Sequence, residues 1–319
     1  MLLHLVIYIL SFAGIWFGSG LAIGSVEKLS RTLKMSQFSI SFLILGVFTS
    51  IGEMSVGINS VLNDDPEIFV GNLIGATIII FMLVIPLLAI FGKSIRISPE
   101  FQGFNLPASL VVISLPVVLA MDGVVSRLDS IIGIVLFLLL LVNIQSKRGI
   151  LEKIKTFTAR STISIGKELF RILFGLTLIF FASKFVVEQT VYFAEVLSVS
   201  PFLISLLFIA IGTNVPELSL VFRSVLSRTN QVAFGDYIGS SAFNTFLFGI
   251  LALVYANPIE LSNSYLVSLL FLIIGLFLFY IFARSKNTIS RAEGLVLLIL
   301  YFLFLGTKIA LHKSLIFWS

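Results

Sequence analysis

Two glutamates lie deep inside long apolar stretches of the sequence, and each follows a threonine by four residues. Because residues four apart share one face of a helix, Thr49 falls on the side of Glu53, and Thr213 on the side of Glu217. Carboxylate and hydroxyl oxygens are hard ligands that suit sodium or calcium. A charge at such depth in a bilayer costs at least ~2.5–3.5 kcal/mol, so we expect a bound cation or a proton to compensate it.

Further oxygen-bearing groups follow the second glutamate. Ser240 and Asn244 are again four residues apart and place two more oxygens on one helix face. Pro216 removes a backbone donor and thereby frees the carbonyl of Gly212 as another oxygen ligand. Asp236 is a third carboxylate in an apolar stretch, but it lies nearer the end of that stretch, where a solvated position is equally compatible.

The composition identifies the elements that must position these groups. Of 319 residues, 58% are hydrophobic and 12% charged, and the mean hydropathy is +1.12. Soluble proteins carry roughly a quarter charged residues, so a soluble globular protein is excluded. Cysteine is absent, and the two histidines, His4 and His312, lie near the chain ends. Thiolate sites are excluded and a histidine centre is not expected, which makes a membrane enzyme the weakest functional class.

Apolar runs long enough to cross a bilayer as helices recur along the whole chain. They predict an all-α integral membrane protein with ten transmembrane helices, because apolar residues on all sides do not fit the alternating strands of a membrane barrel. The first run lacks a basic leader and is interpreted as a retained span. The predicted spans are about 4–23, 38–61, 68–92, 104–121, 128–145, 168–187, 201–226, 231–256, 264–283 and 293–311.

Positive charge separates between the two sides that ten spans define. Seventeen of the 21 Lys and Arg residues fall on one side, and four fall on the other: Arg127, Lys184, Lys308 and Lys313. The positive-inside rule makes the richer side cytoplasmic and places both termini outside, in a multi-pass protein of the cell membrane. We read the net charge of +5 as contact with anionic lipid and expect no nucleic-acid partner.

The chain matches itself at an offset of 164 residues, and nine of the 35 residues from 46 to 80 are identical to their counterparts in 210–244. An odd number of spans in each half would insert the second copy upside down, as in transporters built from inverted repeats with a site near the midplane. We predict a first five-helix repeat at 1–146, a basic cytoplasmic linker at 147–167 and a second repeat at 168–319. Within the repeated segments, Gly71, Gly75, Gly235 and Gly239 should let spans 3 and 8 approach their neighbours closely.

The second copy carries a specific motif. The sequence G-T-N-V-P-E at 212–217, followed by G-D-Y-I-G-S-S-A-F-N at 235–244, resembles the second repeat motif of the sodium/calcium exchangers, in the cation/calcium exchanger superfamily. The resemblance implies no cofactor, and calcium and competing sodium as transported ions, with Glu53 and Glu217 as metal ligands. Asn244 in place of an acid implies no co-transported potassium. The cation ligands that the resemblance implies are Thr49, Glu53, Thr213, Glu217, Ser240 and Asn244.

The first copy departs from the family pattern. Gly52 stands in place of the motif proline, and Ala76 and Ile80 stand in place of a serine and an asparagine. That half keeps its carboxylate and threonine but loses two side-chain oxygens, which leaves stoichiometry and calcium selectivity open. The adjacent Thr77 replaces part of the loss only if the helix register shifts. Possible additional ligands are Asp236, its repeat counterpart Asn72, Thr77 and the carbonyl of Gly212.

The leading functional hypothesis is a secondary antiporter in which inward sodium movement drives calcium outward by alternating access, with spans 1 and 6 as the moving pair. Two alternatives remain open at this point. One is a proton-coupled or sodium-specific cation exchanger. The other is a degenerate, non-transporting membrane scaffold or sensor. Partners are the ions and membrane lipid, and the oligomeric state is open.

Overall fold

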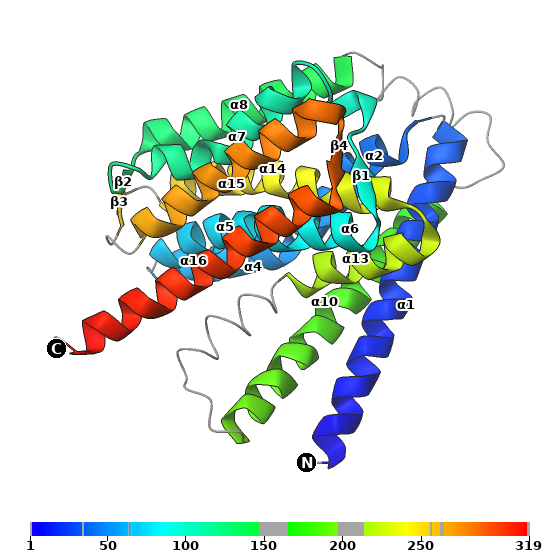
Figure 1. Cartoon of the computed structure of the whole chain (residues 1–319), viewed down its shortest axis with the longest axis horizontal. Coiled ribbons are helices and arrows are strands. Elements are labelled where there is room, and N and C mark those ends of the chain that lie inside the picture. The colour runs from blue at the N-terminus through cyan, green and yellow to red at the C-terminus, as the bar shows by residue number, and fades with distance from the viewer. Residues whose placement is uncertain are drawn as a thin grey trace. The chain divides into compact units, whose positions relative to one another are not determined.

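The computed structural model of the chain is almost entirely helical (Figure 1). Two compact units emerge, Met1–Gly52 with Asn143–Ser240, and Glu53–Val142 with Ser241–Ser319, so each unit draws on both halves of the chain. The division into two sequence repeats with a linker at 147–167 stays a prediction. The structure describes residues 2–33, 35–62, 64, 66–146, 165–196, 214–255, 257–261 and 265–317.

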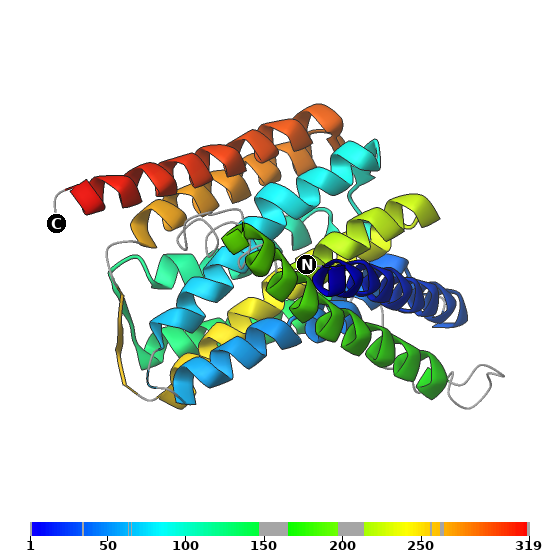
Figure 2. The same cartoon turned by 90° about the horizontal axis from the view of Figure 1, so that it is seen from below.

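The first unit is dominated by two long helices, α1 (Leu2–Leu33) and α10 (Ile165–Val196), which pack along each other (Figures 1 and 2). Glycines make the contact close: a Cβ on Gly18 would lie 2.5 Å from the carbonyl oxygen of Gly175. The backbones of the two helices therefore touch there. The other elements of this unit are α2 (Gln37–Ile40), the π-helix η1 (Ser41–Leu45), α3 (Gly46–Thr49), α13 (Val215–Ser227) and the first part of α14 (Asn230–Tyr255).

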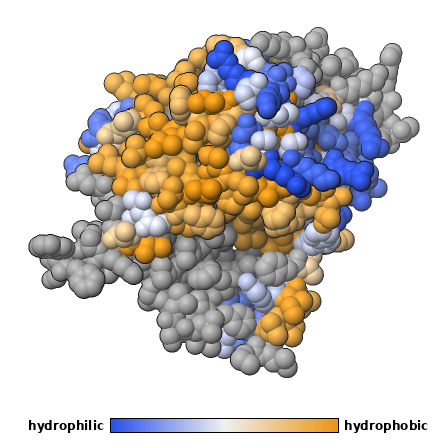
Figure 3. Space-filling view, in the orientation of Figure 1, coloured by the Kyte–Doolittle hydropathy of each residue, from blue (hydrophilic) through white to orange (hydrophobic). Residues whose placement is uncertain are grey.

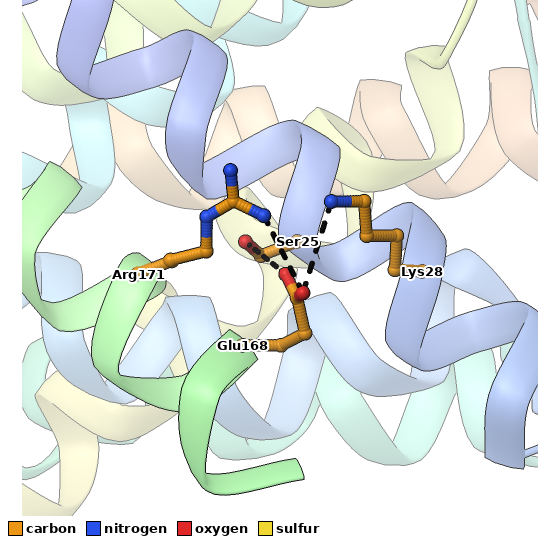
Figure 4. A network of polar contacts seen from close by, with 4 residues as sticks. All are labelled: Ser25, Lys28, Glu168 and Arg171. Carbon is orange, nitrogen blue, oxygen red and sulfur yellow. Dashed lines mark hydrogen bonds and ion pairs between the residues drawn. The ribbon is translucent and has the colours of Figure 1, made fainter. Parts of the chain in front are cut away.

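A buried carboxylate joins α1 and α10 near one end of their contact (Figure 4). Glu168 is only 4% exposed, and its Oε1 lies 3.7 Å from Nζ of Lys28 and 3.4 Å from a guanidinium nitrogen of Arg171. Ser25 donates a hydrogen bond to its Oε2 at 2.8 Å. Because burial of a charge is costly unless it is paired and hydrogen-bonded, this network makes the position of Glu168 between the helices tolerable.

The far end of the same helix pair carries a second polar contact. The His4 ring of α1 stacks on Tyr192 of α10, with centroids 3.7 Å apart and an interplanar angle of 7°. His4 Nδ1 also lies 2.6 Å from Oε1 of Gln189. Polar contacts at both ends and touching backbones between them hold α1 and α10 as one packed pair.

The second unit contains most of the shorter connections. Strands β1 (Ser94–Arg96) and β4 (Thr288–Ser290) pair antiparallel, and so do β2 (Val124–Val125) and β3 (Ile259–Glu260). These short strands were not predicted, because two or three residues in a loop carry no readable periodicity. The helices of this unit are α4 (Ile51–Leu62) from Glu53 onward, α5 (Glu67–Ile79), the π-helix η2 (Ile80–Val84), α6 (Ile85–Phe91), η3 (Pro99–Phe101), α7 (Asn105–Leu119), α8 (Arg127–Ser146) up to Val142, α14 from Ser241 onward, α15 (Tyr265–Lys286) and α16 (Arg291–Phe317).

Seven helical segments in the described part of the chain are long and apolar enough to cross a membrane. Large apolar side chains such as Phe277 of α15 and Phe302 of α16 are exposed. Hydrophobic residues form a broad area on the face drawn in Figure 3, and hydrophilic residues gather at one side of it. The helix α7, in the fourth predicted span, has 15 residues, and residues 201–213 of the seventh span lie outside the described chain. The count of ten therefore stays a prediction. The seven segments are Leu3–Leu33, Gln37–Leu62, Phe69–Phe91, Arg127–Ile144, Asn230–Tyr255, Leu266–Lys286 and Arg291–Ala310.

The glycines of the two repeats differ in how closely other atoms approach them. A Cβ on Gly235 would lie 2.5 Å from the carbonyl oxygen of Phe38, and one on Gly239 would lie 2.8 Å from the Cα of Phe42. The prediction of close helix approach is therefore confirmed for α14. For Gly75, the counterpart of Gly239, no atom of the described residues lies within 4 Å of a Cβ. Residues 202 and 206, the counterparts of Phe38 and Phe42, lie outside the described chain, so close approach at Gly75 stays a prediction.

The two counterparts therefore predict opposite effects of the same substitution. Gly239→Ala forces backbone against backbone and should lower the free energy of unfolding by about 1–3 kcal/mol. Gly75→Ala meets no atom of the described residues and should leave stability unchanged or raise it by about 0.4–1 kcal/mol, because alanine restricts the unfolded chain. Thermal unfolding of the two variants in detergent measures the difference, and equal shifts would contradict the assigned packing.

Candidate cation-binding site

The first repeat motif interrupts its helix without a proline. The helix α3 ends at Thr49 and α4 begins at Ile51, with Ser50 between them at φ −73° and ψ 7°. The hydroxyls of Thr49 and Ser50 lie 3.0 and 2.9 Å from the carbonyl oxygens of Leu45 and Gly46, four residues earlier. A bond of the Ser50 kind, from a side chain to the preceding turn, bends helices. This break is not predicted from the sequence, where the motif differs from the family pattern only by Gly52 in place of proline.

The second motif begins a helix. Asn214, at φ −103° and ψ 14°, precedes α13, and Pro216 stands in its first turn, where a missing backbone donor costs nothing. Glu217 also lies in this turn, at the positive end of the helix dipole, and is 1% exposed. Thr213 and the Gly212 carbonyl, both predicted ligands, lie outside the described residues.

Helix α14 meets this first turn through Tyr237. The Tyr237 hydroxyl donates a hydrogen bond of 2.8 Å to the backbone carbonyl oxygen of Glu217, and its side chain is fully buried. The contact fixes the start of α13 against α14. Sequence reasoning passed over this residue, although a tyrosine next to an intramembrane aspartate was a readable signal.

Asp236 joins the two motifs within the first unit. Its Oδ1 lies 3.0 Å from Oγ1 of Thr49, and it is 0% exposed, so the solvated alternative for this residue is wrong. The backbones also approach closely here, since a Cβ on Gly46 would lie 2.6 Å from the amide nitrogen of Ser240. The position of Asp236 thus results from the packing of α3 against α14.

The remaining predicted ligands are also buried. Ser240 belongs to the first unit and lies 3.3 Å from the carbonyl oxygen of Tyr237, whereas Glu53 and Asn244 belong to the second unit. Both amide atoms of Asn244, and Oε2 of Glu53, have no hydrogen-bond partner among the described residues. An unsatisfied buried polar group costs about 1–3 kcal/mol, so these atoms suit a ligand role.

The first-repeat helix offers fewer oxygens. Ala76 and Ile80 are buried, and Thr77 donates to the carbonyl oxygen of Leu73 at 3.0 Å within the regular helix α5. The helix widens to π geometry only from Ile80 onward, so no register shift involves Thr77. Asn72 is partly buried, and its Nδ2 has no hydrogen-bond partner among the described residues.

Carboxylates alone do not form a metal site in this part of the chain. Among the described residues, no three His, Asp or Glu side chains come together in a way that could hold a metal ion. A cation bound near Thr49 and Glu217 therefore needs hydroxyl, amide or backbone oxygens to complete its shell.

Comparisons with known proteins agree with this architecture. The family model described as sodium/calcium exchanger protein matches residues 3–144 and 167–310. The inner membrane protein YrbG of Escherichia coli strain K12 is 26% identical over 93% of this chain and 94% of its own length. The sodium/calcium exchanger MaX1 of Methanosarcina acetivorans is 30% identical over 44% of this chain and 40% of its own. A structure of the sodium-calcium exchanger NCX_Mj soaked with zero Na⁺ and Ca²⁺ has a TM-score of 0.79 at 23% identity, covering 96% of this chain and 99% of its own.

The Tyr237 contact predicts a measurable effect at Glu217. Tyr237→Phe removes one buried hydrogen bond, so it should lower the free energy of unfolding by about 1 kcal/mol. Tyr280→Phe is the matched control, because that hydroxyl lies at an exposed contact with Arg284. Thermal unfolding in detergent compares them, and equal stability of the two variants would contradict the role given to Tyr237.

Proposed function

Because the chain belongs to the sodium/calcium exchanger family, we propose that this multi-pass integral membrane protein is a secondary active antiporter that exchanges sodium for calcium. The observation that carries the proposal is the burial of Glu53, Glu217 and Asp236 inside apolar helices, at 3, 1 and 0% exposed. Ionised carboxylates at such positions need compensating positive charge, which a transported cation supplies.

The proposed ligands are oxygen atoms from both repeat motifs. Carboxylates of Glu53 and Glu217 carry the charge, and neutral oxygens complete the shell; Thr49, Thr213, Ser240 and Asn244 supply them. Hard oxygen ligands of this kind accept either sodium or calcium. Because both ions compete for the same carboxylates, loading one displaces the other, and this competition couples the two fluxes.

Alternating access requires one part of the protein to move while the site stays fixed. We assign the movement to α1 and α10. Their contacts at Glu168 and at His4 support the view that the two helices move together as one packed pair. The excess of Lys and Arg on one side supports a cell-membrane protein with both termini outside. In that orientation inward sodium movement drives calcium outward.

A second candidate, proton-coupled or sodium-specific exchange, is favoured by one observation. Ala76 of α5 and Ile80 of η2 are buried and have no side-chain oxygen, so the first repeat offers fewer ligands than the second. Calcium prefers six to eight oxygen ligands, and a poorer shell weakens its binding. Calcium uptake driven by a pH gradient in the absence of sodium would favour the proton-coupled form.

The primary test is calcium uptake into proteoliposomes under a sodium gradient. Glu217→Gln removes one charge from the site and should lower uptake at least about tenfold, because a unit charge a few ångströms from the ion contributes several kcal/mol. Glu260→Gln, at an exposed position in the short strand β3, is the matched control and should transport normally.

Uptake that persists unchanged in Glu217→Gln would refute the assignment. A wild-type protein that binds calcium but moves no ion across the membrane would instead indicate the non-transporting scaffold or sensor.

A further inference from the structure

The two repeat helices differ in charge at one matched position. At the repeat offset, Asp236 of α14 corresponds to Asn72 of α5, and Ser240 and Asn244 correspond to Ala76 and Ile80. Asp236, Ser240 and Asn244 recur every four residues, so one side of α14 carries a carboxylate, a hydroxyl and an amide. The equivalent positions of α5 carry one amide and two apolar groups. The polar side chains are therefore concentrated on α14, and the carboxylate of Asp236 is a charge that the matched positions of the first repeat lack.

The hydroxyl of Thr49, a proposed ligand of the ion, lies next to the carboxylate of Asp236. Its Oγ1 lies 3.0 Å from Oδ1 of Asp236 and 3.0 Å from the carbonyl oxygen of Leu45. A threonine hydroxyl has one proton and two lone pairs, so it donates to only one of these acceptors at a time. Donation to the carboxylate is the stronger bond and turns the lone pairs of Thr49 away from Asp236.

We infer that Asp236 is a specificity-determining residue that favours divalent over monovalent cations at the site containing Thr49. It acts through its charge and by orienting the Thr49 hydroxyl, so it needs no direct bond to the ion. The inference rests on the proposed function, because it concerns the same ions and the same site.

The effect of Asp236 on affinity depends on the charge of the ion. The interaction energy of a fixed charge with an ion is proportional to the charge of the ion, so calcium gains twice as much as sodium from the same carboxylate. Affinity depends exponentially on this energy. Removing the charge should therefore change the calcium affinity by about the square of the factor for sodium.

The test is Asp236→Asn, an almost isosteric change that reproduces the residue found at position 72. Half-saturating concentrations of calcium and of sodium come from the rise in unfolding temperature of the full chain in detergent as each ion is added. We expect the calcium value to increase at least about tenfold and the sodium value about threefold. Asp236→Ser, also neutral, carries the same expectation and replaces the first variant if that one does not fold.

Two further variants separate charge from structure. Asp236→Glu keeps the charge and should keep the ratio of calcium to sodium affinity close to that of the wild type. Thr49→Val removes one oxygen without changing charge, and it should weaken both ions by similar factors.

Equal changes for calcium and sodium in Asp236→Asn, or no change, would overturn the inference while leaving the exchanger assignment intact. Failure of the assignment is recognised separately, by uptake that is unaffected in Glu217→Gln. If neither ion stabilises the wild-type protein, both conclusions fall.

Discussion

The structure depends on one constraint, which is that carboxylates are buried among apolar helices where water cannot solvate them. Glu53, Glu217 and Asp236 are all inaccessible, and a charge in such surroundings is tolerated only when other groups compensate it. The chain shows the two forms that such compensation takes. Glu168 is surrounded by two cationic side chains and a hydroxyl, which makes it a structural link. Among the carboxylates of the repeat motifs, Asp236 lies beside a neutral group, the hydroxyl of Thr49. A hydroxyl next to a carboxylate suits the cation site proposed above.

Interrupted and closely packed helices bring these groups together. The break at Ser50 ends α3 just after Thr49, and the start of α13 places Glu217 in a first turn. Helix α14 meets both elements, at Asp236 and at Tyr237, with glycines allowing the backbones to approach. The Ser50 hydroxyl bonds the preceding turn at the break of the first repeat, whereas Pro216 stands in the first turn of α13 in the second.

The two copies have also diverged in what they offer an ion. The second-repeat helix carries Asp236, Ser240 and Asn244, whereas the first keeps only Asn72 among the corresponding residues. This concentration of charge and oxygen atoms on one helix makes the proposed site asymmetric, although the two segments resemble each other in sequence. The pairing of α1 with α10 is independent of this asymmetry, because its polar end contacts and the approach of Gly18 to Gly175 involve none of these residues.

The sequence by itself determined the class of protein, the approximate helical segments, the 164-residue repeat and the family, because these depend on composition and on residues close together in the chain. It also selected Glu53, Glu217 and Asn244, since a polar residue in an apolar helix is visible without a structure. The tertiary structure decided the rest. The burial of Asp236, its contact with Thr49 across 187 residues and the bond from Tyr237 to Glu217 depend on which helices pack together, and so does the close approach of Gly239 to Phe42. Packing between segments distant in the chain leaves no periodic signal in a single sequence, so these features became visible only in three dimensions.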